Sequence, residues 1–311
     1  MAATRPQRAQ EAPAPYAGRS RRSEGEEPNH PASPFLKWAG GKSQLLTRFA
    51  TFYPPAGQVE RFIEPFVGGG AVFFHVKHVL RPKRCWLFDR NDELITTYKS
   101  LQNDLPAVLE LLARHKSLHN EDHYYEVRAQ RPETLSEAAR AARFIYLNKT
   151  CYNGLYRVNS RNEFNVPMGR YVRPGVYDTR NLEAVRACLR GVKLETREFA
   201  HVLKVARAGD FIYFDPPYDP VSGSASFTSY TAHSFSREDQ EALAEVYGAL
   251  GARGCHVMLS NSDTPFVRRL YRAFDVHQVP ARRAINTRAD RRGPVAELVV
   301  LNYRPPRASK R

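Results

Sequence analysis

Asp215, Pro216, Pro217 and Tyr218 directly follow the apolar run Phe-Ile-Tyr-Phe at 211–214. A carboxylate and a backbone carbonyl held by proline can both accept hydrogen bonds from one exocyclic amino group, and a tyrosine ring offers a face on which a heterocycle can stack. This order of residues predicts a buried strand that ends in a clamp for a planar amino group, with a nucleobase as the candidate ligand. The structural alternative for Asp215 is an aspartate that caps a turn.

A second cluster lies upstream, where Glu64, Pro65 and Phe66 lead into the glycines at 68–70. Glycines after a strand let a ligand approach the backbone, and an acid at the end of the next strand can hydrogen-bond ribose hydroxyls. Asp89 stands in that position, 21 residues after Gly68. The dinucleotide pattern GxGxxG is incomplete because its last position is not glycine. A plain tight turn and a helix cap are the alternatives for these residues.

The segment Gly41-Lys42-Ser43 resembles the end of a phosphate-binding P-loop, but Leu36 stands where that motif needs its first glycine. We therefore set a P-loop aside. Trp38 and Lys42 could instead hold an aromatic and a cationic group over a small zwitterionic ligand. Core packing of Trp38 and solvent exposure of Lys42 are the alternatives.

The elements that must position these residues alternate between strand and helix, which predicts an α/β fold with a mostly parallel, helix-covered sheet. The apolar runs predict strands at 62–66, 85–88, 192–196, 211–214, 255–260, 274–279 and 296–303. The helical patterns fall at 71–80, 104–116, 135–147, 236–250 and 264–271, with a further helix beginning near Asp92.

The alternation of strand and helix breaks between 95 and 189, where helical stretches lead into a polar, aromatic segment with hairpin-like turns. We interpret 95–189 as an inserted, mainly helical target-recognition subdomain that carries a β-hairpin. Residues 34–94 and 190–311 would form the catalytic domain. Residues 1–33 hold only Met1 and Tyr16 as large apolar residues, so we expect a disordered tail.

The chain is basic, with a formal net charge of +15. Residues 253–311 contribute 13 Lys and Arg against four acids. A basic folded body suits binding to a phosphate backbone, although a basic surface can also serve solubility alone. The segment 281–293 is rich in arginine, and we expect it to be a loop that binds phosphates.

The sequence does not predict a metal site or a membrane span. Cys85, Cys151, Cys188 and Cys255 lie far apart and lack the spacing of a zinc site, so we expect reduced structural cysteines and no metal. No apolar run reaches about 18 residues and the start does not read as a signal peptide. We expect a cytoplasmic protein, a monomer, with no membrane association.

Taken together, FLKWAGGK at 35–42, FIEPFVGGG at 62–70, the pair FD at 88–89 and DPPY at 215–218 resemble the Dam-type (class alpha) DNA adenine-N6 methyltransferases. Their order along the chain agrees as well, and the resemblance extends over roughly residues 34–303. It implies a Rossmann-like S-adenosylmethionine-dependent methyltransferase fold that acts on double-stranded DNA. The methyl group of S-adenosyl-L-methionine would be transferred to N6 of a flipped adenine, in the site GATC.

The resemblance also assigns roles to single residues. Asp215, Pro216, Pro217 and Tyr218 match the catalytic motif. The cofactor positions are Trp38, Lys42, Glu64, Pro65, Phe66, Gly68, Gly70, Asp89, Phe199 and Asp215. The DNA positions are Lys37, Tyr152, Asn153, Leu155 and Arg157, whose side-chain types also suit base-edge contacts and wedging into a vacated stack.

Three rival functions remain open from the residues. An RNA adenine-N6 methyltransferase or a DNA cytosine-N4 methyltransferase could use the same amino-group clamp, and the turn at 152–157 argues against both. A non-catalytic DNA-binding module is the third, which the intact motifs oppose.

Overall fold

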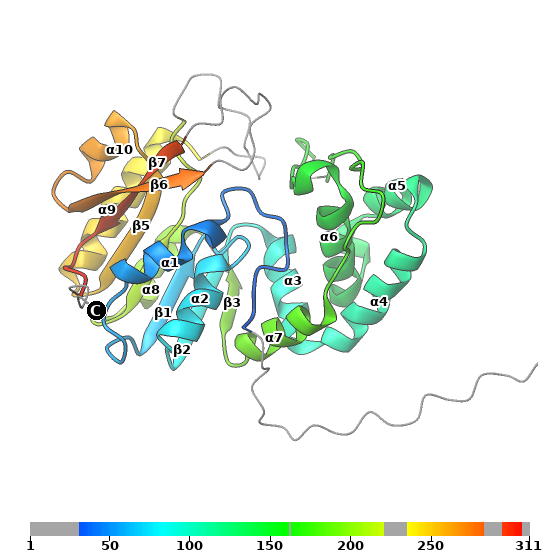
Figure 1. Ribbon diagram of the computed structural model, residues 1–311, viewed down its shortest axis with the longest axis horizontal. Helices are drawn as coiled ribbons and strands as arrows, with labels where there is room; N and C mark the ends of the chain where they lie inside the picture. Colours follow the sequence, from blue (N-terminus) through cyan, green and yellow to red (C-terminus); the bar gives the residue numbers. More distant parts are fainter. Residues whose placement is uncertain (1–30, 162, 221–234, 283–293, 307–311) are drawn as a thin grey trace, which may run out of the picture.

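The computed structural model describes residues 31–161, 163–220, 235–282 and 294–306 (Figure 1). Most of the expected tail, 1–33, lies outside the described residues. The same holds for most of the basic segment 281–293.

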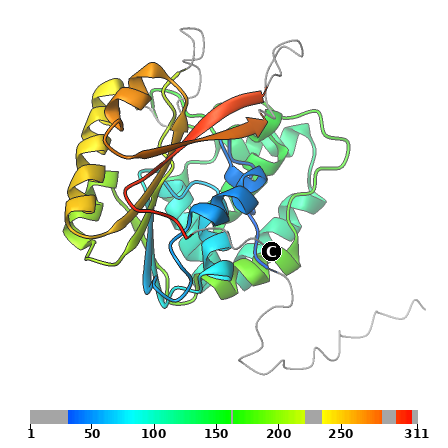
Figure 2. The ribbon, with the colours of Figure 1, turned by 60° about the vertical axis from the view of Figure 1, so that its left-hand side comes forward.

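Within these residues, seven strands form one sheet in the order β3-β2-β1-β4-β5-β7-β6. The strands are β1 (Arg61–Pro65), β2 (Arg84–Asp89), β3 (Lys193–Thr196), β4 (Phe211–Phe214), β5 (His256–Ser262), β6 (Asp275–Arg282) and β7 (Pro294–Leu301). Strands β1 to β5 are parallel, whereas β7 runs antiparallel to β5 and β6; the long β6–β7 pair is seen side by side in Figure 2. The expected mostly parallel α/β sheet is confirmed.

The strand order reverses between β1 and β4, which are paired in parallel. The chain leaves β1 toward β2 and leaves β4 toward β5, so the loops after these two strands diverge. In open α/β sheets, ligands bind at such a switch point, beyond the carboxyl ends of the strands. The two motifs that the sequence singled out, after β1 and after β4, therefore meet at one place.

Apolar side chains that alternate along each strand divide the core into two layers. In β4, Phe211 and Tyr213 join the cluster on one face, and Ile212 and Phe214 join the cluster on the other. All four residues are fully buried. A strand covered on both faces reads as a continuous apolar run, as this one does.

Helices cover both faces of the sheet, and a further group of helices lies beside it (Figure 1). Those of the sheet region are α1 (Leu46–Phe49), α2 (Ala71–Val79), α8 (Val202–Val205), α9 (Arg237–Ala252) and α10 (Pro265–Leu270). Between β2 and β3 lie α3 (Asp92–Asn103), α4 (Leu105–Ser117), α5 (Glu121–Ala129), α6 (Glu137–Thr150) and α7 (Thr179–Leu189). Short 3-10 turns occur at Lys42–Gln44, Ala50–Phe52, Pro132–Thr134, Tyr152–Gly154 and Phe199–His201. Figure 1 shows α4, α5 and α6 grouped on the side away from β6 and β7.

The segment expected to be a β-hairpin has less regular pairing than a hairpin of two strands. Two isolated antiparallel bridges, Cys151 with Met168 and Val158 with Phe164, hold its arms together. Helix α5 was not expected from the sequence, because its nine residues include few apolar side chains. The division of the chain into catalytic and recognition domains stays a prediction.

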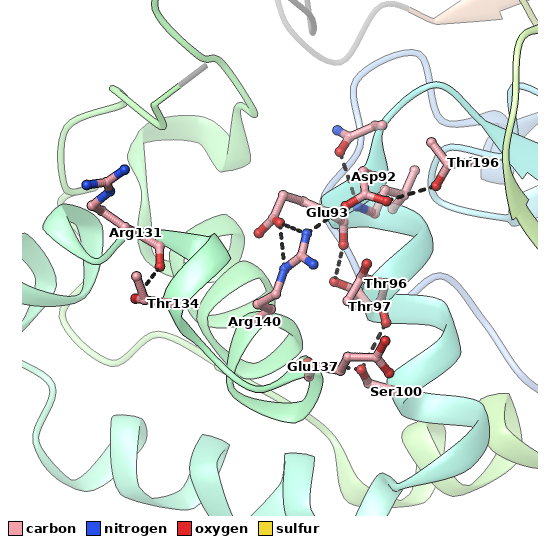
Figure 3. A network of polar contacts seen from close by, with 12 residues as sticks. Asp92, Glu93, Thr96, Thr97, Ser100, Arg131, Thr134, Glu137, Arg140 and Thr196 are labelled. Atoms are coloured by element: carbon pink, nitrogen blue, oxygen red, sulfur yellow. Dashed lines mark hydrogen bonds and ion pairs between the residues drawn. The ribbon is translucent and has the colours of Figure 1, made fainter. Parts of the chain in front are cut away.

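A polar network joins α3 to α6 (Figure 3). Helix α3 begins at the expected position, where the Asn91 side chain accepts a hydrogen bond from the backbone N–H of Leu94. Arg140 of α6 donates to Asp92 Oδ2 at 2.7 Å and, through Nε, to Glu93 Oε1 at 2.9 Å. Both acids lie in the first turn of α3, where negative charge is favourable. None of the helices in the described part of the chain is both long and apolar enough to cross a membrane.

We predict that Arg140→Ala lowers the free energy of unfolding by about 2 kcal/mol, because two carboxylates, one of them largely buried, lose charged hydrogen-bond donors. Arg131→Ala is the control. Arg131 pairs with Glu133 in an exposed position, so its loss should leave the free energy of unfolding nearly unchanged. Urea unfolding of both variants measures the difference, and equal losses would contradict the structural role given to Arg140.

Candidate functional site at the carboxyl ends of β1 and β4

Asp215 lies at the end of β4 and its carboxylate receives two contacts on one oxygen. Ser260 Oγ of β5 donates to Oδ1 at 2.8 Å, and the Lys42 ammonium lies 2.8 Å from the same atom. Tyr213 and Ser260 share a 2.7 Å hydrogen bond between their hydroxyl groups, so Ser260 is itself held in place. Ser260 and Tyr213 were not predicted as site residues, because nothing in their local sequence indicates that they meet Asp215.

Lys42 is a buried cation, with 3% of its surface exposed. Its ammonium donates to the Gly40 carbonyl and lies 4.7 Å from the centroid of the Tyr218 ring. One ammonium thus contacts both the carboxylate and the ring of the predicted amino-group clamp. The alternative interpretation of Lys42, a solvent-exposed side chain, is wrong because the side chain is buried.

Tyr218 is oriented by a residue from a distant strand. Its hydroxyl donates to Glu297 Oε2 of β7 at 2.8 Å. The backbone of the same loop is held by Gln240 of α9, whose side-chain amide donates to the Pro217 carbonyl at 2.8 Å. Pro216 is buried and Pro217 exposed. Glu297 and Gln240 are further site residues that sequence reasoning missed.

Glu64, at the end of β1, is fully enclosed beside this cluster. Its Oε2 has no hydrogen-bond partner within the described residues. Burial, and then the neighbouring Asp215 carboxylate, raise the pKa of Glu64 well above its usual value, while a backbone hydrogen bond from Phe73 and the Lys42 charge oppose the rise. A buried carboxylate oxygen without a partner is costly, so Glu64 Oε2 suits a ligand that brings a donor or a positive charge.

The loop after β1 leaves no room for side chains at its glycines. A Cβ on Gly68 would lie 2.6 Å from Nε1 of Trp38, and one on Gly70 would lie 2.6 Å from the Tyr98 hydroxyl. Both glycines also have positive φ, and so does Phe66 at 64°. A non-glycine residue in that region is strained, and such strain is concentrated at functional sites. Pro65, between Glu64 and Phe66, is buried.

Asp89 of β2 holds the glycine loop from the side. Its Oδ2 accepts from the Gly68 N–H at 3.2 Å and its Oδ1 from the Asn91 N–H at 3.0 Å. Burial raises the pKa of Asp89, while backbone hydrogen bonds act in the opposite direction. The side chain therefore organises the loop at the position from which a ribose would be reached.

Aromatic rings line the same end of the sheet. Phe66 and Phe199 stack with centroids 5.5 Å apart and 23° between their planes. Phe235 packs edge-on against both, at 5.7 and 5.9 Å. Phe199, the aromatic residue expected here, thus lies beside the glycine loop. Phe235 was missed because it follows a polar stretch with no motif.

The predicted DNA residues come together in a second group. Tyr152, Asn153 and Arg157 are exposed and Leu155 is half-buried. Asn153 has a positive φ of 55°, and Arg157 Nε donates to Asn165 Oδ1 across the turn at 2.8 Å. Lys37 lies directly against this turn, since a Cβ on Gly154 would be 2.4 Å from the Lys37 Cβ.

Trp38 lies between the two groups. Its ring faces the glycine loop, as the Gly68 contact shows, and stacks on Tyr156 with centroids 6.1 Å apart and 23° between the planes. Tyr156 is a buried residue of the same turn, 152–157. In the described ranges, no three His, Cys, Asp or Glu side chains are grouped so as to hold a metal ion.

Comparison with known proteins points to one family. The model of the D12 class N6 adenine-specific DNA methyltransferase family matches residues 38–285. The type II methyltransferase M.MjaIII of Methanocaldococcus jannaschii is 42% identical over 285 residues, which cover 87% of this chain and 99% of that protein. A type II methyltransferase of Lactococcus lactis is 40% identical, with 87% and 95% covered. The DNA adenine methylase of Escherichia coli is 36% identical, also with 87% and 95% covered.

We predict that Glu64→Gln stabilises the ligand-free protein at neutral pH. A carboxyl group whose folded pKa is raised binds its proton more tightly in the folded state, so its contribution to stability falls as pH rises from the usual value toward the folded one. The amide removes this effect. Melting temperature measured from pH 4 to 8 should show the variant above the parent by roughly a few degrees at pH 8, with the gap closing at acid pH.

Glu60→Gln is the control, because Glu60 is an exposed acid next to the same strand. Because Lys83 lowers the pKa of Glu60, this variant can only lower the melting temperature at pH 8 relative to pH 4, which is opposite in sign to the effect of Glu64→Gln. A Glu64→Gln variant that melts below the parent at pH 8 would contradict the unfavourable burial of this carboxylate.

Proposed function

The chain belongs to the D12 class of N6 adenine-specific DNA methyltransferases, and we propose that it methylates the adenine of GATC after flipping that base out of the duplex. The methyl donor is S-adenosylmethionine, and the activity is methyl transfer to N6 of adenine in DNA. The RNA and cytosine-N4 alternatives are set aside because the family is adenine-specific and acts on DNA. The observation that carries the proposed site is the Lys42 ammonium between Asp215 and Tyr218.

The residues around the glycine loop fit the donor that the family uses. Its amino-acid part carries a carboxylate and an ammonium, and the cluster offers a buried cation in Lys42 and a buried, unpartnered carboxylate oxygen in Glu64. Asp89 would hold the ribose. The Phe66 and Phe199 rings would contact the adenine, and Trp38, Pro65, Gly68 and Gly70 would shape the walls.

S-adenosylmethionine supplies, when bound, a methyl group on a positively charged sulfur, an excellent leaving group that calls for neither a metal nor a covalent enzyme intermediate. The task left to the protein is to position the nucleophile. Adenine N6 is a poor nucleophile because its lone pair is conjugated into the ring. Asp215 and the Pro216 carbonyl accept hydrogen bonds from its two N–H groups, which favours a pyramidal nitrogen with its lone pair free. The sulfur leaves as a neutral thioether, and the methylated nitrogen then loses one proton. Tyr218 stacks on the base.

Lys42 contacts two members of this clamp. Its ammonium lies 2.8 Å from Asp215 Oδ1 and 4.7 Å from the centroid of the Tyr218 ring, so it shares the Asp215 carboxylate with the proposed site of the adenine amino group. A ligand carboxylate would compete with Asp215 for Lys42. The release of Asp215 then makes its oxygen available to the adenine amino group.

An adenine inside a duplex is out of reach of such a clamp, so the base must leave the stack. We assign recognition of the DNA sequence to the exposed turn at 152–157. Arg157 suits guanine and Asn153 suits adenine, and Tyr152 or Leu155 can fill the space that the flipped base leaves in the stack. Lys37 would contact the DNA beside them. The subdomain 95–189 carries this turn, and the enzyme acts as a monomer.

The test of this specificity uses radiolabelled S-adenosylmethionine, duplexes with GATC, duplexes with each single-base change, and matching RNA. We expect the label in N6-methyladenine of the GATC duplex, with each changed base lowering the rate by about 5-fold to 150-fold. 2-Aminopurine in place of the target adenine should brighten on binding, because flipping unstacks it. Equal rates on all duplexes would refute the GATC assignment, and unchanged 2-aminopurine fluorescence would refute flipping.

We predict that Asp215→Asn lowers the transfer rate by about 10³-fold, because it removes both the amino-group acceptor and the charge partner of Lys42. DNA affinity should stay within about threefold, because the exposed turn at 152–157 is unchanged. Asp210→Asn is the matched control. Asp210 precedes β4 as Asp215 follows it, and pairs with Arg61 as Asp215 pairs with Lys42. It should lower the melting temperature but not the rate per folded molecule. Single-turnover kinetics decide, and parental turnover in Asp215→Asn would refute its role.

A further inference from the structure

Two buried asparagines anchor the segment 33–38, the dark-blue chain that crosses in front of α3 in Figure 1. Asn181 of α7 accepts from the Ser33 N–H at 2.9 Å and donates to the Ser33 carbonyl at 3.0 Å. Asn148 of α6 accepts from the Lys37 N–H at 2.7 Å and donates to the Lys37 carbonyl at 2.8 Å. Each amide binds one residue in the way that a neighbouring strand would.

Asn148 makes one bond that Asn181 does not. Its side-chain NH2 also donates to the Gly154 carbonyl at 3.1 Å. Asn148 is 1% exposed and lies in the last turns of α6. It therefore joins three backbone groups from two segments that are more than a hundred residues apart, Lys37 and the exposed turn.

The surroundings make this junction stiff. Gly154 has a positive φ of 63° and packs on the Lys37 side chain with no space for a Cβ. The Lys37 ammonium donates to the Lys149 carbonyl at 3.1 Å and lies 3.9 Å from the centroid of the Tyr171 ring. On the far side of the backbone, Trp38 stacks on Tyr156. The turn is held by its backbone, while the side chains of Tyr152, Asn153 and Arg157 are exposed.

We propose that Asn148 is a specificity-determining positioning residue, which sets the exposed turn in register with Lys37. It is too deeply buried to touch DNA itself. This inference rests on the proposed reading of DNA by residues 152–157. Base-edge hydrogen bonds depend on direction, whereas phosphate contacts are mainly electrostatic and tolerate small displacements. Loss of Asn148 should therefore weaken binding to the cognate site and leave non-specific binding in place.

The test compares Asn148→Ala, Asn148→Asp and Asn181→Ala by fluorescence anisotropy, with S-adenosylhomocysteine present. The quantity is the ratio of Kd for a single-base variant duplex to Kd for the GATC duplex. We expect both Asn148 variants to lower this ratio by roughly tenfold. The Kd for the GATC duplex should rise, and the Kd for the single-base variant duplex should stay the same. Asn148→Asp keeps the acceptor for the Lys37 N–H and loses both donors, and serves if the alanine variant does not fold.

Asn181→Ala removes the same kind of clamp from the same segment, so it controls for loosened packing. This variant should keep the parental Kd ratio, although its melting temperature should fall by about as much as that of the Asn148 variants. A parental ratio in the Asn148 variants, or an equal loss in Asn181→Ala, overturns the proposal. If the parent itself does not prefer GATC, the proposed specificity fails on its own; sequencing the methylated members of a random duplex pool then supplies the parental site, on which the same variants are compared.

Discussion

The ion pair between Lys42 and Asp215 is the interaction on which the arrangement of the site depends. A cation that is 97% withdrawn from solvent requires a carboxylate partner, and Asp215 supplies it at 2.8 Å from the end of β4. The pair fixes the segment 35–42 across the switch point of the sheet. Glu64 is enclosed beside the pair, so the cluster holds two acids and one base. Removal of Lys42 or Asp215 leaves the other without its charge partner, whereas Glu64 adds a carboxyl group that burial makes costly to ionise. The site is thus balanced for a ligand that carries charges of both signs.

The structure of the sheet explains why a polar cluster forms at this place. Strands β1 and β4 are parallel neighbours. All of β4 is apolar and fully buried, and β1 adds the buried Phe62 and Ile63, so polar groups gather toward the ends of these strands. The loops that follow diverge, and the space between them receives the glycine turn, Asp215 and the aromatic rings of Phe66 and Phe199. The strain at Phe66 and the unpartnered oxygen of Glu64 both lie at this point. The free energy gained by burial of the apolar interior offsets the cost of these unfavourable local features.

Much of this was predictable from sequence. Continuous apolar runs ending in Asp-Pro-Pro-Tyr and in Glu-Pro-Phe gave strands with polar ends, and a parallel sheet brings such ends to one edge. Ser260, Glu297 and Asn148 could not be found in this way, because each acts through a partner far along the chain and its own neighbours are ordinary for a strand or helix. The bonds from Asp89 to the backbone of the glycine loop were also invisible, since the same residue suits a helix cap or a ribose contact. Sequence identifies chemically distinctive segments; tertiary packing decides which side chains hold them.

The turn at 152–157 and the cluster around Asp215 differ in whether the functional side chains are also packing side chains. In the cluster, function and packing use the same atoms: Lys42 is both a core contact and a candidate ligand group, so it cannot change without disturbing the fold. In the turn, the backbone is fixed from beneath by Asn148 and Lys37, while Tyr152, Asn153 and Arg157 face outward. Their replacement would leave the buried contacts intact. A protein built in this way can alter the DNA sequence that it prefers by changing outward side chains, while the chemistry stays tied to residues that the core itself requires.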